Sequence, residues 1–240
     1  MITTTLLKAA DSGSKRTTIE ELSLPAGGHL PLSKIPEEQL LYVVSGRGII
    51  SLYDPAPDGD VYELRQETAV YMTPAIRYEL FNTGQPPLVL VALKVAGGEA
   101  PPEEGGGLTW SAVSQRGVTV DKPAPGAGTI VTRVFDERLN PSKEEGMHLR
   151  IRDVLLRRPQ KMANAEVLTV APGRATRLHT HYDTSESSYV LSGEGVFVWD
   201  DKQIPCKAGD VISYPLGVMR QVINTGRFPL TYVLIASFID

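Results

Sequence analysis

The sequence contains two copies of one unit, and this internal duplication constrains the fold more than any other feature. Residues 27–95 correspond to residues 173–238 through strand-like runs and turns alike. Three pairs of segments carry the correspondence: YVVSGRGIISLYD (42–54) with YVLSGEGVFVWD (189–200), AVYMTPAIRYELFNTG (69–84) with DVISYPLGVMRQVINTG (210–226), and PPLVLVALKV (86–95) with FPLTYVLIASF (228–238). Because turns as well as strands correspond, chance is a poor explanation, and two similar units are predicted.

Each unit has the pattern of an all-β domain. Short runs rich in Val, Ile, Leu, Tyr and Thr are separated by Gly, Pro, Asn and Asp, which predicts an antiparallel sandwich or barrel. Gly- and Pro-rich stretches separate the halves. We expect an N-terminal barrel over residues 1–97, a connecting segment over 98–145 and a C-terminal barrel over 146–240. Residues 128–135 and 148–155 alternate as strands and are predicted to extend the two barrels' sheets or to cross between them.

Two histidines in the second copy are the strongest chemical signal. His179 and His181 are two residues apart in a run that alternates as a strand does, so both imidazoles are expected on one face. Residues 182–185 can turn the chain, and Glu186 opens the next strand-like run. Its carboxylate can therefore return over the two rings. Two imidazoles and one carboxylate on facing strands form half a shell for a divalent transition metal, with open coordination positions.

These residues carry a resemblance to a known family. The first signature motif of the cupin superfamily is similar to a spacing found here, G-x5-H-x-H-x4-E-x6-G, formed by Gly173, His179, His181, Glu186 and Gly193. The second signature resembles the segment 209–224, GDVISYPLGVMRQVIN. The resemblance implies two tandem, pseudo-symmetric cupin barrels, that is, jelly rolls or double-stranded β-helices. In the family a histidine, usually the fourth metal ligand, follows three positions after the second glycine of this motif. This chain has Arg220 there.

The resemblance also implies a cofactor, one divalent transition metal ion held by the two histidines and Glu186. This ligand set suits Mn, Fe, Ni, Co or Zn. No separate organic cofactor is predicted. In the first copy the matching positions hold Ser33, Ile35 and Gln39. Since an isoleucine cannot bind a metal, the N-terminal barrel is predicted to be degenerate and metal-free.

Arg220 leaves two interpretations open. Its planar guanidinium can hold a substrate carboxylate or phosphate beside the metal, which makes it the predicted catalytic and substrate-binding residue. It can instead pair with Glu186, draw that carboxylate away from the metal and leave a vestigial site. Arg177, on the face of the two histidines, is a candidate second anion contact. Tyr214, just before the Pro-Leu-Gly turn, is a further substrate-binding candidate.

Charge and composition restrict the classes of partner and the cellular location that are expected. A net charge of -4 offers no footprint for nucleic acid or an anionic membrane surface, so neither partner is expected. The N-terminus has no apolar run of the signal-peptide type, and the single cysteine, Cys206, suits a reducing compartment, so a cytoplasmic location is expected. A small anionic molecule is the predicted partner. The two barrels are expected to pack together within one chain, and a homodimer is predicted in addition.

The lead hypothesis for function is a metal-dependent cupin enzyme that acts on a small anionic metabolite in the C-terminal barrel. The resemblance allows a dioxygenase, an isomerase, a decarboxylase or an aminohydrolase, because the fold does not choose among them. Ureidoglycine aminohydrolases resemble the chain in length and in having one silent barrel, but their metal ligands are a Glu, two His and a Gln in a different order. The alternative is a non-catalytic bicupin that binds a small molecule or only assembles, with a vestigial metal site.

Overall fold

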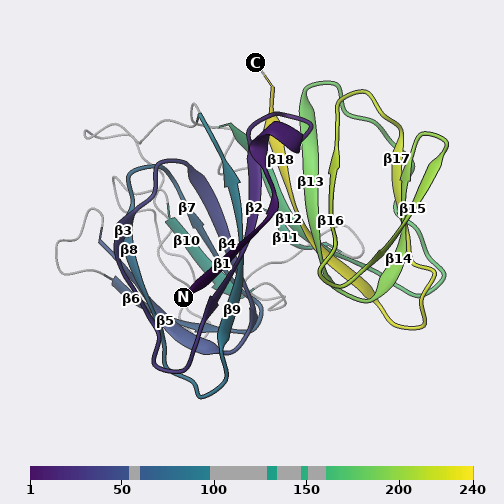
Figure 1. The fold of residues 1–240 in the computed structure, drawn as a ribbon. Helices are drawn as coiled ribbons and strands as arrows, with labels where there is room; N and C mark the ends of the chain where they lie inside the picture. Colours follow the sequence, from purple (N-terminus) through teal and green to yellow (C-terminus); the bar gives the residue numbers. More distant parts are fainter. Residues whose placement is uncertain (54–59, 98–128, 134–146, 151–160, 240) are drawn as a thin grey trace.

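The computed structural model describes residues 1–53, 60–97, 129–133, 147–150 and 161–239. These residues form eighteen strands in four antiparallel sheets and one short 3-10 turn, η1 (Ala9–Asp11). Figure 1 shows the sheets gathered into two barrels that lie side by side. The all-β prediction is confirmed. Among the described residues, no helix has the length and apolar character needed to cross a membrane.

The first barrel consists of two sheets. The larger has the order β1 (Ile2–Leu7), β2 (Thr17–Leu24), β9 (Leu88–Val95), β4 (Glu38–Ser45), β7 (Thr68–Met72) and β10 (Thr129–Arg133). The smaller has the order β3 (His29–Lys34), β8 (Arg77–Asn82), β5 (Arg47–Leu52) and β6 (Asp60–Arg65). Leu, Ile, Val and Met side chains from both sheets meet in one buried cluster inside this barrel.

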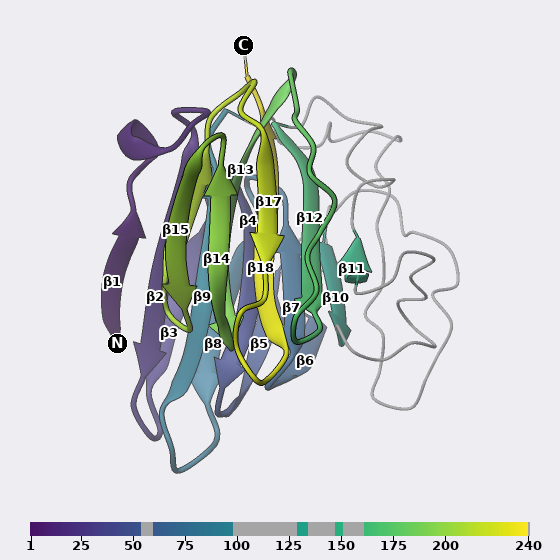
Figure 2. The ribbon, with the colours of Figure 1, turned by 90° about the vertical axis from the view of Figure 1, so that its right-hand side faces the viewer.

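The second barrel repeats the plan. Its larger sheet has the order β11 (Met147–Arg150), β12 (Met162–Val170), β18 (Leu230–Phe238), β13 (Thr184–Ser192) and β16 (Val211–Tyr214). Its smaller sheet has the order β15 (Lys202–Lys207), β14 (Glu194–Trp199) and β17 (Arg220–Ile223), and it stands in front of β18 and β13 in Figure 2. The order β2-β9-β4-β7 thus matches β12-β18-β13-β16, as two copies of one unit require.

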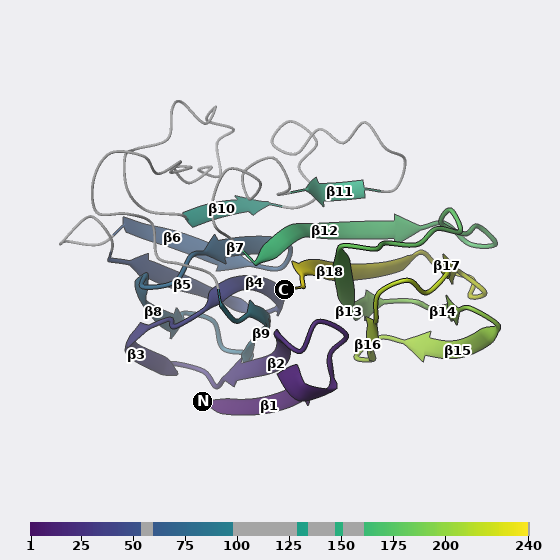
Figure 3. The same cartoon turned by 90° about the horizontal axis from the view of Figure 1, so that it is seen from above.

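Each barrel gains one further strand, β10 within the predicted stretch 128–135 and β11 at the start of the predicted stretch 148–155, of which residues 151–155 lie outside the described part of the chain. β10 pairs with β7 of the first barrel, and β11 pairs with β12 of the second. Figures 2 and 3 both place β10 and β11 next to each other on one side of the molecule. The boundaries at residues 97 and 145 remain predictions, because most of residues 98–146 lie outside the described part of the chain.

The two barrels pack face to face through their larger sheets. One buried apolar cluster contains side chains of both, including Leu40, Tyr71 and Leu93 from the first barrel and Val167 and Ile235 from the second. The predicted packing of the barrels within one chain is therefore confirmed. The N-terminal segment contributes as well: the backbone N–H of Gly13 donates to Ser213 Oγ at 3.0 Å, and Thr17 Oγ1 lies 2.8 Å from Ser237 Oγ.

Glu38 is a charged group buried within this interface. One carboxylate oxygen, Oε1, accepts the backbone N–H groups of Lys161 at 2.6 Å and Met162 at 3.1 Å. The other, Oε2, accepts the Tyr71 hydroxyl at 3.1 Å. Burial raises the pKa of Glu38 from 4.5 to about 7, although the three hydrogen bonds favour the charged form. Glu38 therefore links the two barrels by hydrogen bonds, and burying its carboxylate away from water is unfavourable.

The raised pKa makes interface stability depend on pH. Because the folded protein holds the Glu38 proton more tightly than the unfolded chain, this group stabilises the fold fully below about pH 4.5. That contribution is lost as pH rises towards 7, by up to about 3 kcal/mol. Glu38→Gln keeps an acceptor for both backbone N–H groups and does not titrate. We expect the difference in unfolding free energy between wild type and Glu38→Gln to change by this amount between pH 4.5 and 8, measured by urea denaturation. A pH-independent difference would contradict the assignment.

Candidate metal centre

Glu186 lies on an interior strand of the larger sheet of the second barrel. It lies on β13, opposite Tyr214 of β16 on one side and Ala236 of β18 on the other. Opposed residues of antiparallel strands point to the same face. Glu186 therefore shares the face of Tyr214, which belongs to the buried cluster inside the second barrel. Its side chain is 13% exposed, so the carboxylate lies near the barrel's mouth rather than in solvent.

The histidine segment is extended but is not the regular strand that the alternation predicted. Two isolated bridges tie it to β17, Ala175 with Ile223 and His179 with Arg220. Between them, Thr176 exchanges hydrogen bonds with Val222 and accepts one from the side chain of Gln221. Between these bridges one strand advances by four residues and the other by three. The extra residue interrupts the ladder, as a β-bulge does. β13 also begins at Thr184, two residues before the predicted start at Glu186.

The three predicted ligands nevertheless come together. One ligand atom from each of His179, His181 and Glu186 lies within 4.8 Å of the others. The two imidazole centroids are 5.1 Å apart with planes 79° apart, and His181 Nε2 lies 3.3 Å from Glu186 Oε1. No other group of this kind occurs among the residues that the structure describes. The two histidines and the carboxylate thus converge on one point from two different segments.

A backbone contact orients one of the imidazoles. His179 Nδ1 lies 2.8 Å from the carbonyl oxygen of Arg177. A carbonyl only accepts hydrogen bonds, so Nδ1 must carry the proton and donate, which leaves the lone pair on Nε2. Histidines that ligate metals commonly donate their other ring nitrogen in this way. The donor set therefore fits a divalent transition metal ion.

Arg220 lies inside the barrel and not at its surface. The side chain is 2% exposed, its Nε lies 3.2 Å from Glu186 Oε2, and its guanidinium carbon is 5.7 Å from the centroid of the Tyr214 ring. Within the described residues, Nε, Nη1 and Nη2 all lack a partner in hydrogen-bonding geometry. The contact with Glu186 is thus a close ion pair with poorly directed N–H groups. Burial lowers the pKa of Arg220 to about 10, so the guanidinium remains charged at neutral pH.

Two acidic groups share this interior. Burial raises the pKa of Glu186 to about 8, and repulsion from Glu166 adds to the shift. Glu166, on β12, is buried and accepts a hydrogen bond from Asn164 Nδ2 at 2.5 Å. The sequence analysis missed Glu166. The repeat could have indicated it, because Glu20 occupies the same register in the first barrel, opposite Ala92 as Glu166 is opposite Leu234.

The remaining candidates divide into two groups. Tyr214 is buried beside Arg220, burial raises the pKa of its hydroxyl, and this hydroxyl has no hydrogen-bond partner in the described part of the chain. Arg177 is exposed, and only its backbone carbonyl is placed against the cluster.

In the first barrel, Ile35 is buried in the apolar interior and Ser33 donates to the Pro31 carbonyl. At the position that corresponds to His181, the first barrel therefore holds a buried apolar side chain.

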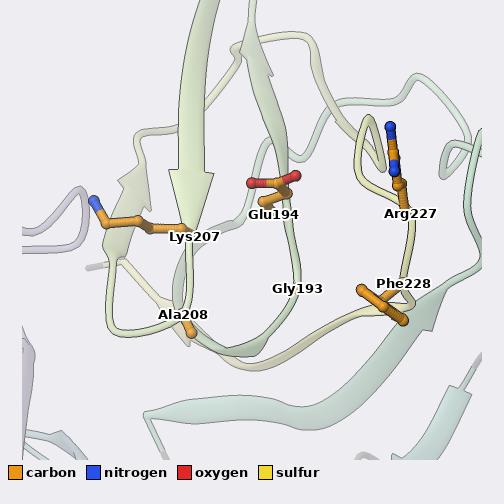
Figure 4. Close-up of a pocket in the computed structure, with 6 residues that line it drawn as sticks. All are labelled: Gly193, Glu194, Lys207, Ala208, Arg227 and Phe228. Atoms are coloured by element: carbon orange, nitrogen blue, oxygen red, sulfur yellow. The ribbon is translucent and has the colours of Figure 1, made fainter.

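An open hollow of about 420 Å³ lies elsewhere on the second barrel. Figure 4 shows its lining residues: Gly193, Glu194, Lys207, Ala208, Arg227 and Phe228. Gly193 follows the last residue of β13, whereas Glu186 is near the first, so the hollow is at the opposite end of the barrel from the histidines. None of the candidate ligands borders it.

Comparison with known proteins identifies the family. A model described as "Cupin domain" matches residues 166–236, the part of the chain that contains Glu186 and Arg220. The oxalate-binding protein of Thermotoga maritima is 30% identical over 103 residues, which are 43% of this chain and 83% of that protein. The chain belongs to the cupin superfamily. Because the model covers the second half, it is this half that retains the family's sequence pattern.

Solved structures extend the likeness to both barrels of this cupin. The Escherichia coli protein YlbA superposes with a TM-score of 0.67 at 19% identity, over 98% of this chain and 81% of that one. Oxalate decarboxylase of Bacillus subtilis, a protein with Mn(II) centres, superposes with a TM-score of 0.69 at 15% identity, over 99% of this chain and 75% of that one. At these identities the likeness concerns the fold alone. The fold is that of two tandem cupin barrels.

Proposed function

We propose that the C-terminal barrel holds one divalent transition metal ion through His179, His181 and Glu186 and acts on a small carboxylate that Arg220 orients beside it. The observation that carries this proposal is the buried guanidinium next to the three clustered ligands, with its terminal nitrogens unpartnered. Buried polar groups are almost always hydrogen-bonded, so a buried guanidinium without a protein partner is a candidate anion-binding group. The relatives that bind or decarboxylate oxalate support a small dicarboxylate as the ligand class.

The roles of the residues follow from their positions. A divalent ion at this cluster would supply a Lewis acid with open coordination positions. His179, with its Nδ1 proton held by the Arg177 carbonyl, presents Nε2 as a ligand atom. Arg220 fixes the plane of a carboxylate by two parallel N–H···O bonds. The Tyr214 ring lies against the Arg220 guanidinium, so its hydroxyl is a candidate second donor to the carboxylate.

One experiment distinguishes turnover of the ligand from binding without reaction. Protein loaded with Mn²⁺ and freed of excess ion is incubated with ¹³C-labelled oxalate, and the solution is followed by NMR and by CO₂ release. We expect each oxalate, with one proton, to yield one CO₂ and one formate, at a rate that falls to background for His179→Ala with His181→Ala. Retention of bound, unchanged oxalate would instead establish a binding protein, the function that the Thermotoga maritima relative's name describes. Absence of both metal and oxalate binding would refute the proposal.

A further inference from the structure

The loop between β1 and β2 of the first barrel reaches the second barrel behind its candidate metal centre. Figure 3 shows this loop next to β16. The backbone N–H of Gly13 in this loop donates to Ser213 Oγ at 3.0 Å, and Ser213 Oγ lies 2.8 Å from Ser187 Oγ. These opposed serines adjoin Tyr214 and Glu186 in the chain, and successive residues of a strand point to opposite faces. The loop therefore lies against the outer side of the strand pair whose inner side carries Tyr214 and Glu186.

Gly13 approaches this strand pair too closely for a residue with a side chain. A Cβ atom on Gly13 would lie 2.6 Å from the Tyr214 carbonyl oxygen, 2.8 Å from Pro215 Cα and 3.0 Å from the Pro215 nitrogen. All three are backbone atoms, which cannot move aside as the end of a flexible side chain does. Glycine at position 13 thus lets the loop pack directly on the peptide bond between Tyr214 and Pro215.

The residues on both sides of Gly13 hold the loop in shape. Ser12 Oγ accepts the backbone N–H of Thr17 at 3.2 Å. Ser14 Oγ accepts the backbone N–H of Arg16, also at 3.2 Å. Both serines are buried. Because hydrogen bonds fix the neighbours of Gly13, the loop can act as a rigid support for the second barrel.

The peptide bond that Gly13 contacts begins the turn that holds the histidine segment. Gly217, at the end of this turn, has a left-handed φ of 74°, and its N–H donates to the His181 carbonyl oxygen at 2.9 Å. The turn thus connects Tyr214, whose ring lies against the Arg220 guanidinium, to His181. A displacement of its first peptide bond can therefore reach a candidate metal ligand through a short piece of backbone and one hydrogen bond.

We infer that Gly13 is a positioning residue, through which the first barrel fixes His181 and Glu186 in the second barrel. The inference rests on the proposed function for the identity of the metal ligands. It goes beyond that function because it gives the first barrel a part in the site of the second. Groups that orient metal ligands from outside typically change metal affinity by about 10- to 100-fold when they are altered.

The test is Gly13→Ala in the full chain. The added methyl group should displace the first peptide bond of the turn and weaken the hydrogen bond from Gly217 to His181. In the metal-free protein we expect the Gly217 amide to exchange with D₂O about tenfold faster than in wild type, as followed by NMR. The affinity for Mn²⁺ should fall about tenfold, and the EPR spectrum of the bound ion should change because the ligand geometry changes.

Thr17→Val is the matched control. Thr17 Oγ1 lies 2.8 Å from Ser237 Oγ, so this variant breaks a contact across the same interface, but to β18 and not to the turn. It should lower the unfolding temperature and leave Gly217 exchange, Mn²⁺ affinity and the EPR spectrum as in wild type. If Gly13→Ala does not fold by circular dichroism, Ser213→Ala replaces it. That variant removes the acceptor of the Gly13 N–H without adding an atom, and it should accelerate Gly217 exchange and weaken Mn²⁺ binding.

Two results would overturn the inference. One is a variant that folds and retains the wild-type Gly217 exchange rate and EPR spectrum, whether Gly13→Ala or its replacement Ser213→Ala. The other is an equal change in Thr17→Val, which would show that the loop acts only through overall stability. If wild type binds no Mn²⁺, the proposed function fails, and Gly217 exchange in the metal-free protein still decides whether Gly13 positions the histidine segment.

Discussion

Replacing His179 and His181 together by alanine is expected to reduce the bound metal from about one ion per chain to background. The two imidazoles are two of the three converging ligands, and Glu186 alone cannot retain a transition metal against buffer. The measurement is elemental analysis of protein purified without chelator or a nickel column, with Mn²⁺ added and excess ion removed. Wild type should also gain thermal stability when Mn²⁺ is added, because the ion binds only the folded state, and the double variant should not.

The matched control is His29→Ala. His29 lies in the first barrel, where its ring stacks on Phe81 with centroids 4.0 Å apart, and it should leave the metal content unchanged. At most one ion per chain is expected, because Ile35 fills the equivalent position in the first barrel. A value near two ions would show that the N-terminal barrel binds metal as well. An undiminished metal content in the double variant would show that the ion binds at a site other than the two histidines.

Arg220→Met is expected to weaken oxalate binding to the Mn²⁺-loaded protein by about 1.5–3 kcal/mol, or roughly 10- to 150-fold, while the metal content stays near that of wild type. The loss is the usual contribution of hydrogen bonds to a charged group, and the metal remains because Arg220 is not a ligand. Methionine preserves much of the buried volume. Arg220→Lys keeps the charge without the planar fork and should recover only part of the affinity. Dialysis against ¹⁴C-oxalate and elemental analysis provide the two measurements.

Arg220→His probes the opposite interpretation, in which the pair with Glu186 marks a vestigial site. Histidine restores the ligand that other cupins place here, so it should tighten metal binding and weaken binding of the carboxylate. A wild type with little metal that gains it only in Arg220→His would favour the vestigial site and overturn the proposed function. Because Arg220 and Glu186 form a buried pair, each variant is compared in its metal-loaded form, where Glu186 retains a positive partner.

The sequence by itself determined the duplicated all-β plan and the residues of the cluster formed by two histidines and one glutamate. Strand patterns are local, since alternation with a period of two and the turn residues between strands suffice to define them. The cluster of His179, His181 and Glu186 was predictable because all three residues lie within eight positions of one another. A single turn brings them together, whatever the rest of the barrel does. The prediction that the first barrel binds no metal followed in the same way from Ile35.

The tertiary structure alone decided what surrounds that cluster. Glu166 acts on Glu186 from another strand of the sheet, and no local pattern specifies that proximity. The pairing of Arg220 with Glu186 was one of two interpretations that the sequence left open, and the structure shows the contact. The histidine segment is not a regular strand because it has one extra residue opposite β17. Register depends on both paired segments, so the pattern of one segment alone does not predict it. The pKa values of Glu38 and Glu186 are raised by burial, and burial is a property of the packed molecule.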